Sequence, residues 1–157
     1  MSAIADRSRG VALAALGLLL GGCSLAMDLP PEFLRVSEAP GLCAATPQDA
    51  TLQVRNFAES DAGTLDFWFA ALRHNLVDAR GYEVLQETAV SDAVGRPGKL
   101  LRCMTTHAGE RVGYLVAVFV IDGWWSDTIR VVEFSAKEAE FQARVDAVQA
   151  AIATLRP

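Results

Sequence analysis

The chain of 157 residues has few lysines and no apolar run long enough to cross a membrane. Two lysines occur beside twelve arginines, the basic residues are scattered, and 19 acidic residues give a formal net charge of −5. Binding to nucleic-acid phosphates requires clustered Lys and Arg, so we expect no nucleic-acid partner. The uncharged apolar run at residues 11–20 is about half as long as the roughly 20 residues of a membrane-spanning helix.

Motifs of catalysis and cofactor binding are also missing. The sequence contains no GxSxG, HExxH, GxGxxG or EF-hand pattern. No CxxC pair exists, and the two histidines, His74 and His107, are far apart, so we expect no metal site, no cofactor and no enzymatic activity.

Two functional sites stay open as alternatives, a catalytic pair and a calcium site. Thr105 and His107 lie two residues apart on an expected strand and point to the same face, as a nucleophile and its base must. In the second alternative, three loop carboxylates bind a calcium ion weakly: Glu110, Asp122 and Asp127. His74, in contrast, is expected on the solvent side of a helix.

The N-terminus has the layout of a secretory signal. A net positive stretch with Arg7 and Arg9 precedes the apolar run, and two small residues follow it. The string Leu20-Gly21-Gly22-Cys23 resembles the lipobox of bacterial lipoproteins. That resemblance implies attachment of diacylglycerol to the Cys23 thiol, cleavage before Cys23 and acylation of the new amine. A plain signal peptide with an incidental cysteine is the alternative.

This resemblance implies a domain organisation and a location. Residues 1–22 form the signal peptide, residues 23–32 the lipidated cysteine and a tether with two prolines, and residues 33–157 one domain. Two or more acyl chains hold a protein stably at a membrane, so the membrane is an expected partner through the lipid anchor. Ser24 follows the cysteine, which by resemblance to Gram-negative sorting rules favours the outer membrane, facing the periplasm.

Lipidation would leave two other cysteines, Cys43 and Cys103. In an exported protein these thiols can form a disulfide, which requires Cα atoms within about 7 Å. Two separately buried thiols, behaving as small apolar side chains, are the alternative.

Apolar spacing predicts an α+β domain with a single antiparallel sheet of about five strands and two amphipathic helices packed on it. Thr64 caps a helix whose apolar face repeats every three or four residues, and a Ser135–Glu138 capping box begins a second helix. Residues 39–50, with two prolines and a glycine, are expected to be a loop. Five strands are expected at 51–57, 82–90, 99–107, 111–122 and 128–134, and residues 33–37 are a further candidate.

The order strand, helix, strands, helix and the Gly-Arg-Pro-Gly turn at residues 95–98 resemble the PsbP-like fold. Photosystem II PsbP proteins and DcrB-like bacterial lipoproteins have this fold. The resemblance implies a non-enzymatic accessory or binding role, and it carries no functional residue over to this sequence.

Trp124 and Trp125 are the strongest candidates for a partner surface, since Trp is enriched at binding hot spots. In the alternative, one indole closes the edge of the core and the other lies on the surface. We therefore predict a membrane-anchored binding or assembly-accessory module for another envelope protein. A small-ligand or lipid carrier with a pocket between sheet and helices is the second hypothesis. A shallow surface with exposed indoles favours the first, and a deep apolar cavity favours the second.

Overall fold

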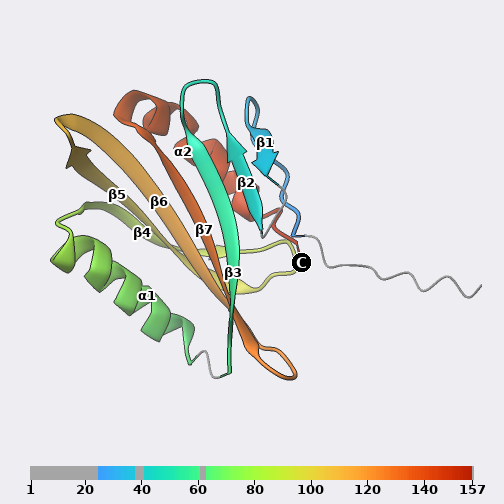
Figure 1. The fold of residues 1–157 in the computed structure, drawn as a ribbon. Coiled ribbons are helices and arrows are strands. Elements are labelled where there is room, and N and C mark those ends of the chain that lie inside the picture. The colour runs from blue at the N-terminus through green and yellow to red at the C-terminus, as the bar shows by residue number, and fades with distance from the viewer. Residues whose placement is uncertain (1–24, 38–40, 61–62, 157) are drawn as a thin grey trace, which may run out of the picture.

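The structure, a computed structural model, describes residues 25–37, 41–60 and 63–156. These residues form one antiparallel sheet of seven strands in the order β1-β2-β3-β7-β6-β5-β4. Helix α1 packs on one face of the twisted sheet and helix α2 on the other (Figure 1). The strands are β1 (Leu34–Ser37), β2 (Leu42–Ala45), β3 (Thr51–Glu59), β4 (Glu83–Ser91), β5 (Pro97–His107), β6 (Glu110–Ile121) and β7 (Asp127–Lys137). The helices are α1 (Leu65–Arg73), which continues as the π-helical segment η1 (His74–Ala79), and α2 (Glu138–Ile152).

The predicted α+β class, the antiparallel sheet and the two helices are confirmed, but the prediction of about five strands is wrong. One unexpected strand, β2, lies in the segment predicted to be a loop. Leu42 and Ala44 are buried on one side of this strand, which pairs with β3. The five residues between Gly41 and Pro47 are enough for a short strand, so the proline and glycine content of the whole segment was misleading.

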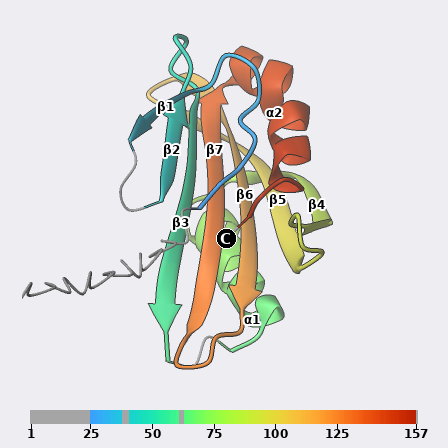
Figure 2. The same cartoon turned by 90° about the vertical axis from the view of Figure 1, so that its right-hand side faces the viewer.

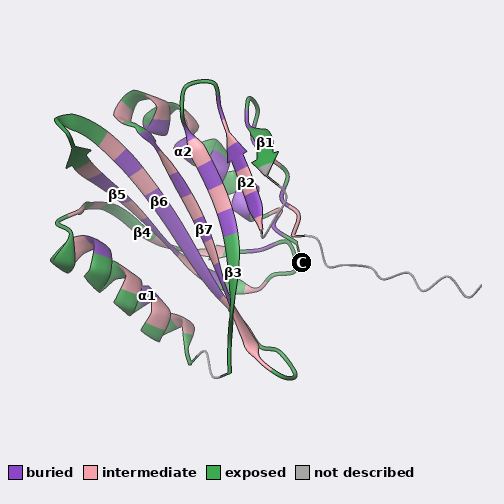
Figure 3. Ribbon diagram, in the orientation of Figure 1, coloured by how far each residue is buried: buried purple, intermediate pink, exposed green. Residues whose placement is uncertain are grey.

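Alternation along the strands builds a separate core on each face of the sheet. The α2 face buries Leu52, Val54 and Phe134 under the helix, and the α1 face buries Leu101 and Val116. Figure 3 shows that burial is concentrated in the central strands and decreases toward α1 and the edges of the sheet.

The two helices begin in different ways. Thr64 caps α1 as predicted, because its hydroxyl accepts a hydrogen bond from the Phe67 amide at 3.2 Å. The predicted capping box of α2 is wrong: strand β7 continues through Lys137, and the Ser135 hydroxyl is hydrogen-bonded to Thr51 across the strands at 2.9 Å. The Phe141 ring then lies against β6 at Gly113, where a Cβ atom would overlap it.

The segment from Leu25 to Phe33 packs on the domain instead of extending from it as a spacer. Met27 and Phe33 are both 5% exposed and belong to the core of the α2 face. Ala26 forms an antiparallel bridge with Arg156, so the start and end of the described chain lie side by side (Figure 2). The domain therefore includes residues that sequence analysis assigned to the tether.

Candidate functional site

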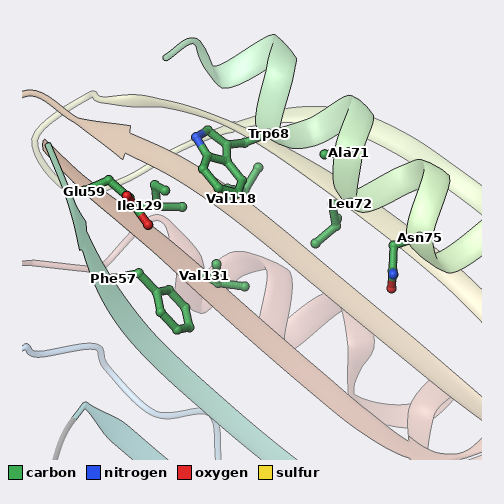
Figure 4. Close-up of a pocket in the computed structure, with 9 residues that line it drawn as sticks. All are labelled: Phe57, Glu59, Trp68, Ala71, Leu72, Asn75, Val118, Ile129 and Val131. Carbon is green, nitrogen blue, oxygen red and sulfur yellow. The ribbon is translucent and has the colours of Figure 1, made fainter. Parts of the chain in front are cut away.

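Helix α1 covers only part of its face of the sheet, and an apolar groove lies where this cover ends. The helix contacts β5 and β6, while β3 and β7 continue beyond it. The groove has a volume of about 410 Å³, within the range of roughly 300–1,000 Å³ that ligand sites occupy. It is lined by Phe57, Glu59, Trp68, Ala71, Leu72, Asn75, Val118, Ile129 and Val131 (Figure 4).

Strand and helix periodicity together produce the groove. Leu52 and Val54 point to the α2 face, while Phe57 stands across from Ile129 on the opposite face. Trp68 and Leu72 lie one helical turn apart on α1 and are partly buried over the sheet. In the sequence of β3, Leu52 and Val54 alternate with polar residues, and Phe57 is one position out of phase with them. This shift was the signal that the other face of the strand also carries an apolar side chain.

Four exposed aromatic residues lie toward the end of the sheet where β3 ends and β7 begins, and we call this region the aromatic end: Phe57, Phe67, Trp124 and Trp125. Phe57 is 45% exposed, Phe67 61%, and each tryptophan 89%. Glu59 pairs with Asp127, so the β6–β7 connection, residues 122–126, begins where the groove opens. Phe67 packs edge-to-face on the groove residue Trp68, with centroids 5.5 Å apart. Both tryptophans thus lie on the surface, and neither closes the core.

The charge at the aromatic end is negative. Glu59, Asp122 and Asp127 lie at the ends of β3, β6 and β7, on either side of the indoles. The nearest cation along β3, Arg55, lies 5.7 Å from the centroid of the Phe57 ring and is also paired with Glu133. An apolar surface with an acidic rim therefore faces solvent.

Farther along the same face the sheet is polar. Tyr114 donates a hydrogen bond to Glu133, and burial followed by this contact raises the pKa of the tyrosine well above its usual value. A second depression, of about 500 Å³, lies beside them and is lined by Arg80, Tyr82, Thr105, Thr106, His107, Val112, Tyr114 and Ser135.

The structure thus brings Thr105 and His107 to one depression, as their spacing predicts. No hydrogen bond joins them among the residues that the structure describes, and no carboxylate lines the depression to orient the imidazole. His74 is exposed, with its Nδ1 atom 2.9 Å from a carboxylate oxygen of Asp78, as expected for the solvent side of a helix.

The predicted disulfide is not formed in this fold. Cys43 and Cys103 are both free, half-buried on β2 and buried on β5 respectively. Strands β3, β7 and β6 lie between them, so at about 4.8 Å per strand the two positions are about 19 Å apart along the sheet. The two thiols are therefore separate, as in the alternative, but only Cys103 is buried. Burial raises the pKa of Cys103 to about 11.

Three further features of the chain are the lipidation residue, metal binding and membrane-spanning helices. The lipidation residue, Cys23, lies outside the described residues. Within the described ranges, no group of three or more His, Cys, Asp or Glu side chains is arranged to hold a metal ion. None of the helices in that part of the chain is both long and apolar enough to span a bilayer.

Fold and site together define a class: an α+β domain with one seven-stranded sheet between two helices and an apolar groove ending in exposed aromatics. This sequence matches no protein-family model and no curated protein. Several solved structures, however, share its fold.

LpqN of Mycobacterium tuberculosis, described as involved in cell envelope biogenesis, aligns with a TM-score of 0.64 at 15% identity over 87% of this chain and 86% of its own. PA94 of Pseudomonas aeruginosa, a protein of unknown function, gives 0.54 at 14% identity over 86% and 83%. The Ran-binding protein Mog1p of Saccharomyces cerevisiae gives 0.52 at 16% identity over 82% and 80%. At these identities the likeness establishes the fold alone.

Proposed function

We propose that this protein is a lipid-anchored component of a bacterial cell envelope that binds another envelope protein through its aromatic end. One observation carries the binding role: Phe57, Phe67, Trp124 and Trp125 are exposed together beside an apolar groove. Exposed apolar patches of this kind mark interaction sites, because the water they order is released on binding. The similarity of the fold to LpqN, an envelope biogenesis protein, supports the setting.

The apolar area and the charge of the site favour one kind of partner. Trp side chains supply much apolar area at a low cost in conformational entropy, which makes them effective anchors. Glu59, Asp122 and Asp127 surround this area, so the complementary surface is apolar with a basic rim. The partner is a folded envelope protein or an extended segment carrying Lys or Arg beside an apolar side chain.

Affinity capture from detergent-solubilised envelopes tests this role. The wild type and a Trp124→Ala/Trp125→Ala variant are compared with a matched control, Leu34→Ala/Val36→Ala, which removes exposed apolar side chains from β1 instead. We expect the wild type and the control to retain the same protein and the tryptophan variant to lose it. Equal recovery with all three would contradict the proposal.

Anchoring rests on the string Leu20-Gly21-Gly22-Cys23 and is tested separately. A clickable fatty acid should label the wild type and fail to label Cys23→Ser, which should leave the membrane fraction. Absence of label on the wild type would refute the anchor without affecting the binding site. Separating inner from outer membranes then tests the proposed outer-membrane location.

A carrier role is the second candidate, favoured by the apolar lining and the volume of the groove. Val118, Ile129 and Val131 form its floor, and Trp68 reports on its occupancy. A fluorescent fatty acid should bind the wild type, and Ala71→Phe, which fills the groove from α1, should weaken that binding. If the wild type and this variant take up the probe equally, the groove is not a carrier site.

A further inference from the structure

The position at which the chain enters the domain limits which surface a lipid attached to Cys23 could lie against. Leu25 is the first described residue and packs against the core of the α2 face. Cys23 is two residues earlier, and two residues of fully extended chain span at most about 7 Å. If Cys23 carries the lipid, as the proposed function requires, the surface around Leu25 lies at the lipid headgroups.

Hydrogen bonds hold Leu25 and its neighbours firmly in this place. The Ala26 amide and carbonyl are both bonded to Arg156, at 3.3 and 2.8 Å. The Asp28 amide donates to the Thr154 hydroxyl at 2.9 Å, and the Asp28 carboxylate pairs with Arg156 at 2.6 Å. No long, loose linker therefore separates the domain from the anchor.

The β4–β5 turn completes this surface. The Ala93 amide donates to the Leu155 carbonyl at 3.1 Å, which ties the turn to the C-terminal segment. Val94 at the tip of the turn is 62% exposed, although it is a large apolar residue in a short loop. Arg96 lies beside it, paired with Asp92 at 2.8 Å.

Charge distinguishes this surface from the aromatic end. Arg96 and Arg156 pair with Asp92 and Asp28, so these four side chains carry no net charge. This surface is thus close to neutral in a chain that is acidic as a whole. The aromatic end carries Glu59, Asp122 and Asp127, and anionic lipid headgroups repel such a surface.

We propose that Leu25, the β4–β5 turn at Val94 and the C-terminal segment at Arg156 form a membrane-seating surface that rests on phospholipid headgroups. The proposal depends on lipidation of Cys23. In Figures 1 and 2 the β6–β7 connection lies at the lower end of the molecule, well away from the C-terminus. Seating on this surface therefore leaves the aromatic end accessible to a partner instead of burying it in lipid.

Depth-dependent quenching tests this orientation. The lipidated protein is inserted into vesicles of phosphatidylethanolamine and phosphatidylglycerol with brominated acyl chains, which quench a nearby indole. One reporter carries Val94→Trp with Trp68, Trp124 and Trp125 changed to Phe, and the matched reporter keeps Trp125 as its single tryptophan. We expect strong quenching of the Val94→Trp reporter and little quenching at Trp125.

The other outcomes would contradict either the proposed orientation or the lipid anchor. Stronger quenching at Trp125 would assign the membrane contact to the aromatic end, and equal quenching would mean that the domain has no fixed orientation. A wild type that takes up no fatty acid would refute the anchor and this inference together, while the capture experiment would still test partner binding.

Hydrogen exchange provides a check without substitutions in the turn. Wild-type protein on vesicles is compared with Cys23→Ser in solution. Amides of residues 93–96 should exchange more slowly on vesicles, and those of residues 122–126 should not change. The reverse pattern would contradict the seating surface.

Discussion

Trp124 packs edge-to-face on Trp125, with ring centroids 6.4 Å apart, while each residue remains 89% exposed. The two indoles shield little of each other from water, and the core does not use them. A large apolar area is thus kept at the surface with no structural need for it. Because the core does not use the indoles, removing them should not change the stability of the fold.

Changing both tryptophans to alanine should leave the stability of the domain nearly unchanged. Exposed positions away from caps and networks shift the free energy of unfolding by about 0.5 kcal/mol or less each. Urea unfolding of Trp124→Ala/Trp125→Ala beside the wild type measures this. A loss of several kcal/mol would mean that the indoles support the fold, and the binding role would then lack its main argument.

The amino-terminal segment should contribute to stability as part of the core. Phe33 is 5% exposed and packs edge-to-face on Phe134 at 6.0 Å between centroids. Phe33→Ala should cost about 3–5 kcal/mol of unfolding free energy, as expected for loss of a buried ring. Leu34→Ala, at the neighbouring exposed position, is the control and should cost little. If Phe33→Ala behaves like the control, the Phe33 ring does not belong to the core of the α2 face.

Sequence patterns predicted the elements that strong local signals define. The cap at Thr64 needs only its own hydroxyl and a nearby amide, and the apolar repeat of the last helix is regular, so both could be found. The packing of residues 25–32 and the strand β2 were not predicted, because the segments around them each contain two prolines. Their apolar residues acquire meaning only when the fold brings them to a distant core, as it does for Met27 and Leu42.

The candidate site could be predicted only in part, because some of its features are local and others depend on contacts between distant residues. Trp124 and Trp125 stand out in any reading of the chain, and their exposure follows from a short hairpin connection. The groove joins Phe57 of β3 to Trp68 of α1, and its extent depends on how far α1 covers the sheet, which no local pattern encodes. The error over Cys43 and Cys103 is of this kind too, since strand order alone separates them.

The two cysteines should differ in reactivity. Cys43 is half-buried on β2, whereas Cys103 is buried and its pKa is raised to about 11, so its thiolate is scarce at neutral pH. In a Cys23→Ser background, iodoacetamide should modify Cys43 alone in the native state and both thiols in urea. A mass spectrum before reduction that lacks two hydrogens would instead reveal the disulfide.

Stability should fall in alkaline solution partly through Cys103. Desolvation raises the pKa of this thiol from 9.0 to about 11, so the folded chain holds the proton more tightly than the unfolded chain. Its contribution is fully present below pH 9 and is lost as the pH rises through about 11. Between these values, the wild type should lose more unfolding free energy than Cys103→Ala, and equal losses would show that the thiol does not titrate as proposed.

The central claim is that the aromatic end contacts a specific envelope protein, and photo-crosslinking in living cells tests it most directly. A photoreactive phenylalanine analogue replaces Trp125 in one strain and Val36, another exposed apolar position, on β1, in the other. The account predicts a discrete crosslinked protein adduct from position 125 and none from position 36. No protein adduct from position 125, or the same adducts from both positions, would contradict it.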